Sequence, residues 1–148
     1  MRIRRAQCDM GCLFLLLLLA VPVGGSVMAA APPPTVYVAN ATAHTLSVFD
    51  TTTNWVVGSP IPIGTSPWAL AVHPTGREVY VADPYTDTVT VIDPGTKSVV
   101  ATIPVGDAPT ALAMHPTGTR LYVANQTAHS VSVIDTATRQ VLKVIPLV

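Results

Sequence analysis

The feature that most constrains the fold is a short motif that recurs at a nearly fixed interval. Residues 37–40 read Tyr-Val-Ala-Asn, residues 80–83 read Tyr-Val-Ala-Asp, and residues 122–125 repeat the first form. The two intervals are 43 and 42 residues. A fixed period of roughly 20 to 50 residues is typical of stacked supersecondary units. We therefore expect residues 36–148 to form copies of one structural unit.

Each unit contains four short apolar segments, which in the middle unit cover 69–72, 78–82, 88–92 and 99–105. Their length and the turn residues between them predict β-strands. The first is apolar on both faces, as in a strand buried on both sides, and the third alternates small hydroxyl and branched apolar residues. The fourth contains Pro104, which cannot donate to a ladder and therefore indicates an edge strand. The expected unit is a four-stranded antiparallel sheet, the blade of a β-propeller.

The chain carries fewer blades than a closed ring needs. We expect an all-β open arc with a partial blade at 36–66 and complete blades at 67–108 and 109–148. The one-residue difference between the intervals falls at 56–63, where we expect a bulge or a longer turn. Closed propellers have about 4 to 8 blades. The chain is therefore interpreted as a fragment of a larger propeller, a protomer that completes a ring with other copies, or a stable open arc.

The first thirty residues have the organisation of a signal peptide. Arginines at 2, 4 and 5 precede an apolar run at 13–23, and small residues at 27–29 match the pattern that a signal peptidase recognises. We expect cleavage after residue 29 or 30, followed by a Pro-rich spacer at 31–35. This predicts an exported protein, in the periplasm, secreted or at the cell surface. Retention as a membrane anchor is the alternative, although the run is shorter than the roughly 20 residues a span needs.

Removal of the leader changes the chemistry that remains. Cys8 and Cys12 both lie in it, so the mature chain has no thiol for a disulfide or a thiolate metal site. Five basic and seven acidic residues are left, a net charge near −2 with His neutral. Nucleic acid and anionic membrane surfaces are recognised by basic fields. We therefore expect neither as a partner, and no membrane span after cleavage.

The repeats also resemble a known family. Tyr-Val-Ala-Asn, a Val-Ser-Val-Ile-Asp strand, an Ile-Pro-Val-Gly exit and a Pro-x-Gly return are similar to the YVTN β-propeller repeat family over residues 36–148. Proteins of that family are exported propellers, often in the periplasm, at the cell surface or in surface layers. Related propellers include lactonases and quinone- or haem-binding oxidoreductase domains. The resemblance implies a fold rather than a reaction.

Blade topology brings the loop after each Tyr motif to the same face as the segment leading into the first strand. This loop face is where a propeller binds a ligand near its channel, and exposed loops often carry binding residues. The alternative is that these are ordinary loop residues, with Trp68 packed against a neighbouring blade. The candidate binding residues on this face are His44, Trp68, Asp83, Tyr85, Asp87 and His129.

Two other repeated sets of polar residues have structural explanations. Asp50, Asp93 and Asp135 each end a third strand, where an Asp side chain accepts hydrogen bonds from backbone amides of the following turn. His73 and His115 occupy the turn between the first and second strands, and we expect them to be solvated and nearly silent on substitution. Equivalent histidines on adjacent blades are expected to lie too far apart for one zinc ion, whose bonds are about 2 Å.

No catalytic motif stands out, so we assign no catalytic residue, no metal site and no cofactor. The favoured hypothesis is an exported propeller module that acts as a non-enzymatic binding or cell-surface scaffold. Its partner is an unidentified ligand or protein, or further copies of itself in a homo-oligomer that completes the ring. The competing hypothesis is a remnant or protomer of a propeller enzyme, either lactonase-like or similar to quinone- or haem-binding oxidoreductases.

Overall fold

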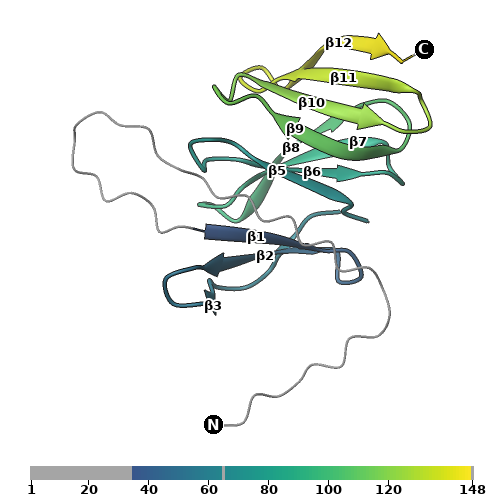
Figure 1. The fold of residues 1–148 in the computed structure, drawn as a ribbon. Helices are drawn as coiled ribbons and strands as arrows, with labels where there is room; N and C mark the ends of the chain where they lie inside the picture. The colour runs from purple at the N-terminus through teal and green to yellow at the C-terminus, as the bar shows by residue number, and fades with distance from the viewer. Residues whose placement is uncertain (1–34, 65, 148) are drawn as a thin grey trace.

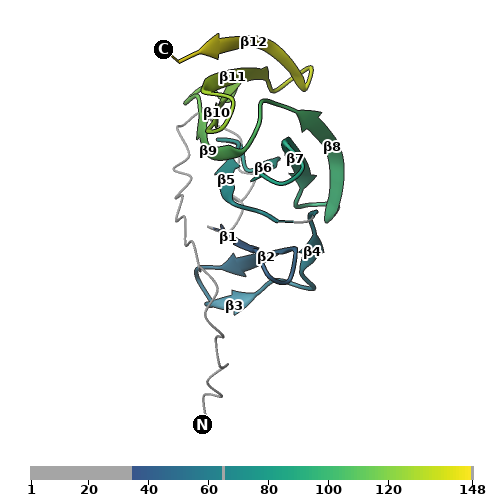
Figure 2. The same ribbon diagram turned by 90° about the vertical axis from the view of Figure 1, so that its right-hand side faces the viewer.

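The computed structural model describes residues 35–64 and 66–147, which contain twelve β-strands and no helix. The strands form three sheets stacked one on another (Figures 1 and 2). The first blade contains β1 (Thr35–Asn40), β2 (Thr45–Asp50), β3 (Trp55–Val56) and β4 (Ile61–Pro62). The middle blade contains β5 (Ala69–Val72), β6 (Val79–Asp83), β7 (Thr88–Asp93) and β8 (Ser98–Pro104). The C-terminal blade contains β9 (Pro109–Met114), β10 (Arg120–Asn125), β11 (Ser130–Asp135) and β12 (Gln140–Pro146).

The predicted antiparallel blades are confirmed. The middle sheet has the order β5-β6-β7-β8 and the C-terminal sheet the order β9-β10-β11-β12, all neighbours antiparallel. The proline-containing strands β8 and β12 lie at the edges, where an N–H lost to proline removes no ladder hydrogen bond. None of the three sheets closes on itself, so the described residues form an open stack of blades.

The first blade departs from the other two in its last strand. The segment that corresponds to β8 of the middle blade is divided into two short strands, β3 and β4, and both pair with β2. The break falls at residues 57–60, inside the segment where the extra residue predicted a bulge or a longer turn. The division gives the first blade four strands among the described residues, where the sequence pattern indicated a partial blade.

The apolar core lies between the blades. We call the side of each sheet that carries the repeated tyrosine its tyrosine face, and the other side its aliphatic face. One cluster joins the tyrosine face of the first blade to the aliphatic face of the middle blade. A second cluster joins the tyrosine face of the middle blade to the aliphatic face of the C-terminal blade, and it includes Tyr80, Leu121 and Val123. Successive side chains along a strand point to opposite faces of the sheet, so each strand contributes to both the tyrosine face and the aliphatic face of its blade.

The predicted signal peptide and spacer fall outside the described residues, except for Thr35, which begins β1. Within the described part of the chain, no helix is long and apolar enough to cross a membrane.

Candidate functional site

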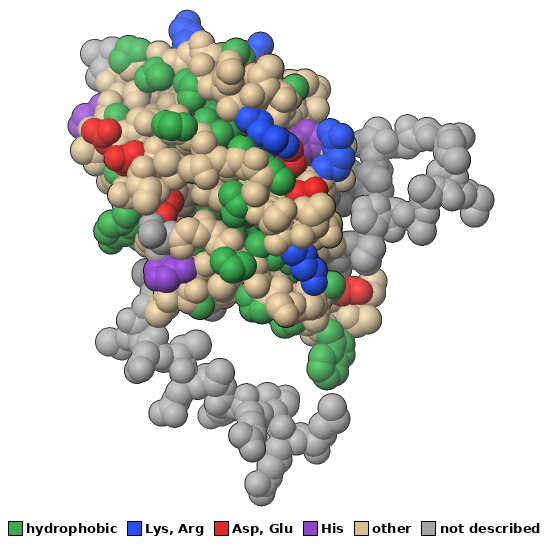
Figure 3. Space-filling model, turned by 180° about the vertical axis from the view of Figure 1, so that it is seen from behind, with side chains coloured by type: hydrophobic (Ala, Val, Ile, Leu, Met, Phe, Trp, Pro, Cys, Tyr) green, Lys and Arg blue, Asp and Glu red, His purple; other side chains and the backbone are tan. Residues whose placement is uncertain are grey.

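An open groove of about 730 Å³ lies between the middle and C-terminal blades, on the face opposite the loop face. It is formed by the turns that join first to second strands and third to fourth strands. Figure 3 shows basic, acidic and histidine side chains gathered at one side of the molecule, upper right in that view. The groove is lined by thirteen residues: His73, Thr75, Arg77, Glu78, Asp93, Val100, Thr117, Gly118, Thr119, Asp135, Thr136, Ala137 and Arg139.

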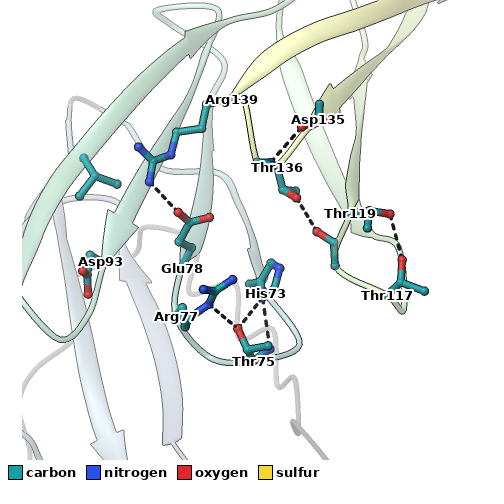
Figure 4. Close-up of a pocket in the computed structure, with 13 residues that line it drawn as sticks. His73, Thr75, Arg77, Glu78, Asp93, Thr117, Thr119, Asp135, Thr136 and Arg139 are labelled. Atoms are coloured by element: carbon teal, nitrogen blue, oxygen red, sulfur yellow. Dashed lines mark hydrogen bonds and ion pairs between the residues drawn. The ribbon is translucent and has the colours of Figure 1, made fainter.

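Glu78 connects the two blades across this groove. Its Oε1 accepts a hydrogen bond from Arg139 Nη2 at 2.8 Å (Figure 4). Its Oε2 accepts one from the Tyr80 hydroxyl. Partial burial acts to raise the pKa of Glu78, but the hydrogen bonds from Arg139 and Tyr80 outweigh it and lower that pKa. Burial, and then the hydrogen bond to Glu78, raises the pKa of the Tyr80 hydroxyl above its ordinary range. Glu78 is therefore held as a carboxylate in which each oxygen accepts a hydrogen bond.

His73 lies at the same blade boundary. Its Nδ1 is 2.7 Å from the Thr75 hydroxyl and accepts the backbone N–H of Thr75 at 3.2 Å, and Arg77 Nε donates to the same hydroxyl at 3.1 Å (Figure 4). The ring packs against Gly118 of the C-terminal blade, where an added Cβ would lie 2.4 Å from His73 Nε2. His73 is only 8% exposed. The prediction of a solvated turn residue is therefore wrong for His73, because the next blade covers it.

The aspartates at the ends of the third strands have the predicted structural role. In Asp50, Asp93 and Asp135, Oδ1 accepts backbone N–H bonds from the residues two and three positions later, at 2.7–3.3 Å. A hydrogen bond from the Thr52 hydroxyl is the main reason that the pKa of Asp50 is lowered. The backbone N–H of Thr138 does the same for Asp135. These carboxylates stabilise turns, two of them at the rim of the groove.

The structure places the six sequence-predicted binding residues at the loop face, on the opposite side of the blades. The loops after β1, β6 and β10 meet the segments that lead into β5 and β9 there, as predicted. For example, Trp68 N donates to Ala82 O at 2.9 Å, and Gln126 N donates to Ala108 O at 2.8 Å. The arrowheads of β6 and β10 point to this face in Figure 1. Shared location, however, does not give the six residues a shared role.

His44, Asp87 and His129 occupy one repeated position with a left-handed backbone, at φ 55°, 56° and 45°. The backbone carbonyls of these residues accept N–H groups at 2.7–3.1 Å. The donors are the residues that directly follow β4, β8 and β12, namely Ile63, Val105 and Leu147. Asp and His tolerate this conformation better than most residues. Asp87 Oδ1 also accepts the N–H of Ala108 at 2.8 Å. The left-handed backbone thus explains why Asp or His occupies this position in each blade.

Asp83 is 4% exposed and braces the surrounding backbone. Its Oδ1 accepts the N–H groups of Tyr85 and Thr86, and its Oδ2 accepts the N–H of Ser66. Trp68 and Tyr85 differ from it, with exposed fractions of 45% and 78%. Their backbones are fixed at the end of β6, through Ala82 and Asp83 respectively. Two aromatic side chains are therefore presented to solvent at one end of the middle blade.

The groove was not predicted from the sequence, because Glu78 and Arg139 are 61 residues apart. The repeat contains a usable signal. Glu78 is matched by Arg120 in the C-terminal blade, and Arg139 is matched by Lys97 in the middle blade. In this chain, the position where the charge changes sign between repeats is the one that forms an ion pair across a blade boundary. Among the described residues, no group of His, Cys, Asp and Glu is placed to hold a metal ion.

Comparisons with known proteins agree with this architecture. A family described as "Lactonase, 7-bladed beta-propeller" matches residues 34–143. Hydrazine synthase from Kuenenia stuttgartiensis is 28% identical, with a TM-score of 0.70 over 84% of this chain and 38% of that chain. A proposed 6-phosphogluconolactonase from Bacteroides fragilis is 19% identical, with a TM-score of 0.66 over 76% of this chain and 36% of its own. The chain thus spans less than two fifths of either structure. No curated protein sequence matches it.

Proposed function

The chain belongs to the family of seven-bladed β-propeller lactonases, and from this premise we propose that it is an exported propeller module acting as a non-enzymatic binding scaffold. We further propose that its blades are YVTN-type repeats and that it works in the periplasm or at the cell surface. The leader at 1–30 and the repeated Tyr-Val-Ala-Asn/Asp motif support these two points.

The observation that carries the binding role is the exposure of Trp68 and Tyr85 at the end of β6. Both backbones are fixed by hydrogen bonds while both side chains face solvent. Trp and Tyr are enriched at binding surfaces because they offer large apolar area with a polar atom. Loops held on a rigid scaffold are common places for such contacts. His44 and His129 are exposed on the same face and extend the proposed surface.

The binding test uses defined probes and a tryptophan signal. Aromatic side chains stack on the apolar faces of pyranose rings and pack against apolar peptides. A pyranose sugar and an apolar peptide are therefore the two probes, titrated separately. The protein carries Trp55→Phe, so that Trp68 is its only tryptophan. We expect a saturable change in Trp68 fluorescence with one probe class. Tyr85→Ala should weaken it by at least about tenfold, the equivalent of roughly 1.4 kcal/mol. Leu142→Ala is the control, because Leu142 is exposed on the edge strand β12. A signal unaffected by Tyr85→Ala contradicts the proposal.

Lactone hydrolysis is the second candidate, favoured by the family match and by the gathering of His73, Glu78 and Arg139 around the groove. Hydrolysis of a lactone needs a base that activates water and a donor or cation near the carbonyl oxygen. Glu78 is a poor base, since its pKa is lowered and each of its oxygens accepts a hydrogen bond. His73 is buried with Nδ1 engaged by Thr75. The geometry therefore supports the scaffold better than the enzyme.

The activity test measures hydrolysis of a panel of lactones, including 6-phosphogluconolactone, against the spontaneous rate. We expect no acceleration by the wild-type protein. Saturable hydrolysis that is lost in both His73→Asn and Glu78→Gln would replace the scaffold with a groove-based lactonase. Saturable hydrolysis that survives both substitutions and co-purifies with the protein would also contradict the scaffold and would place the activity outside the groove.

A further inference from the structure

The loop face carries acidic but no basic side chains in the described part of the chain. Asp83 ends β6, Asp87 directly precedes β7, and Asp107 lies between β8 and β9. In Figure 3 this face lies at the left, where acidic and histidine side chains gather. Lys143 is inside β12, and the other basic residues are at the opposite face: Arg77, Lys97, Arg120 and Arg139. Four acidic residues balance them there: Asp50, Glu78, Asp93 and Asp135.

Asp83 lies next to both segments that carry the exposed aromatic side chains. Its Oδ1 accepts the N–H of Tyr85 at 2.9 Å. Its Oδ2 accepts the N–H of Ser66, two residues before Trp68, at 2.9 Å. Asp83 is only 4% exposed and thus contributes its negative charge instead of a contact with a partner.

The other two carboxylates of the loop face lie in neighbouring segments. Asp87 follows Tyr85 by two residues, and its Oδ1 accepts the N–H of Ala108 at 2.8 Å. That bond brings the segment with Asp107 beside the loop that carries Tyr85. Asp107 is exposed, whereas Asp87 is half-buried. Asp107 is therefore the carboxylate best placed to contact a partner.

The middle blade differs from its neighbours at the positions of these aromatic and acidic residues. The described counterparts are threonine or histidine: Thr42 and Thr127 for Tyr85, Thr110 for Trp68, and His44 and His129 for Asp87. The three residues at the position of Asp87 share a left-handed backbone, which therefore does not require a carboxylate. The combination of two aromatic side chains with carboxylates is thus particular to the middle blade and is not a demand of the fold.

This combination selects for positive charge. The face of an aromatic ring attracts cations, and that of Trp does so most strongly. Carboxylates without a basic neighbour strengthen the attraction and oppose the approach of anions. We propose that the partner of the surface around Trp68 and Tyr85 is an apolar peptide segment that carries Lys or Arg side chains. This inference rests on the proposed binding role of the surface and names the chemistry of its partner.

The test uses three apolar peptides of one sequence that differ only at two positions, which hold Lys, Gln or Glu. Each peptide lacks tryptophan and is titrated into the Trp55→Phe protein, with the fluorescence of Trp68 as the signal. We expect the Lys peptide to bind at least about tenfold more tightly than the Gln peptide, and the Glu peptide to bind more weakly than either. A rise in NaCl from about 50 to about 500 mM should weaken only the Lys peptide.

Two charge variants locate the attraction on the protein. Asp107→Asn should weaken the Lys peptide by about three- to tenfold and leave the Gln peptide unchanged. Asp50→Asn is the matched control, because it removes the same charge at the opposite face and keeps an acceptor for its turn. It should change the affinity for the Lys peptide by less than about twofold, since screening weakens distant charges. Circular dichroism confirms that both variants fold.

The outcomes separate this inference from the proposed function. Equal binding of the Lys and Gln peptides, or a signal with the pyranose alone, overturns the inference and leaves the binding surface in place. Equal losses in Asp107→Asn and Asp50→Asn overturn it too, because the attraction would then follow the net charge of the protein. If neither the peptides nor the sugar change the Trp68 signal, or if Tyr85→Ala binds the Lys peptide unchanged, the proposed function fails as well.

Discussion

The middle and C-terminal blades have the same order of strands and nearly the same motif, yet they bury different residues. Tyr80 is fully buried and Tyr122 is 36% exposed, although both follow a charged and an aliphatic residue and precede Val-Ala. His73 is 8% exposed, whereas His115 at the same position is only half-buried. The difference comes from what lies next to each blade. A blade's own sequence sets its strands, and the next blade in the stack sets its burial.

The largest effect should appear when the two tyrosines are truncated. Tyr80→Ala removes a ring packed between two blades and should lower the free energy of unfolding by about 3–5 kcal/mol. Tyr122→Ala should cost below about 1 kcal/mol, because its ring is partly in water. Urea denaturation of the two variants beside the wild type measures both losses. Equal losses would mean that the next blade does not create the core around Tyr80.

A second comparison uses two glycines at one repeated position. Gly76 and Gly118 have φ values of 71° and 76°, so alanine costs roughly 1–2 kcal/mol at either. Nothing lies within 4 Å of a Cβ at Gly76, but a Cβ at Gly118 meets the His73 ring. Gly118→Ala should therefore cost about 1–3 kcal/mol more than Gly76→Ala, the usual range for overpacking. If thermal melts place the two variants together, His73 and Gly118 are not in close contact.

The smallest effect concerns the ion pair between Glu78 and Arg139. The folded-state pKa of Glu78 is lowered, so its stabilising contribution is present above the unfolded value of about 4.3 and is lost as pH falls through the folded pKa. Arg139 is well exposed, which limits the contribution to about 0.2–1 kcal/mol. Glu78→Gln should therefore be less stable than wild type at pH 7 and equally stable near pH 2. A difference that persists at low pH would assign the loss to packing instead of charge.

The repeat period and the strand chemistry predicted most of the fold. Pro104 identified the edge strand β8, and the segment 69–72, apolar on both faces, was predicted to be a strand buried on both sides, as β5 is. The aspartates at strand ends were assigned correctly because their hydrogen bonds are local, two or three residues along the chain. Such local contacts can be predicted from one sequence because the interacting residues are close in sequence as well as in space.

The candidate site was harder to predict because its contacts join different blades. The burial of His73 depends on Gly118, and Glu78 depends on Arg139, both in the next repeat. Asp83 was predicted to be a binding residue, but its side chain accepts hydrogen bonds from the backbone of Ser66 and Tyr85. Residue type and loop position could not separate exposed Tyr85 from buried Asp83.

The most direct test of the role of the neighbouring blade is the accessibility of the repeated tyrosines to nitration. The folded protein is treated with tetranitromethane, and nitration of each tyrosine is quantified by peptide mass spectrometry. We predict that Tyr85 and Tyr122 react while Tyr80 is protected, because Tyr80 is buried and its raised pKa disfavours the reactive phenolate. Equal modification of Tyr80 and Tyr122 would contradict the conclusion that the next blade determines burial.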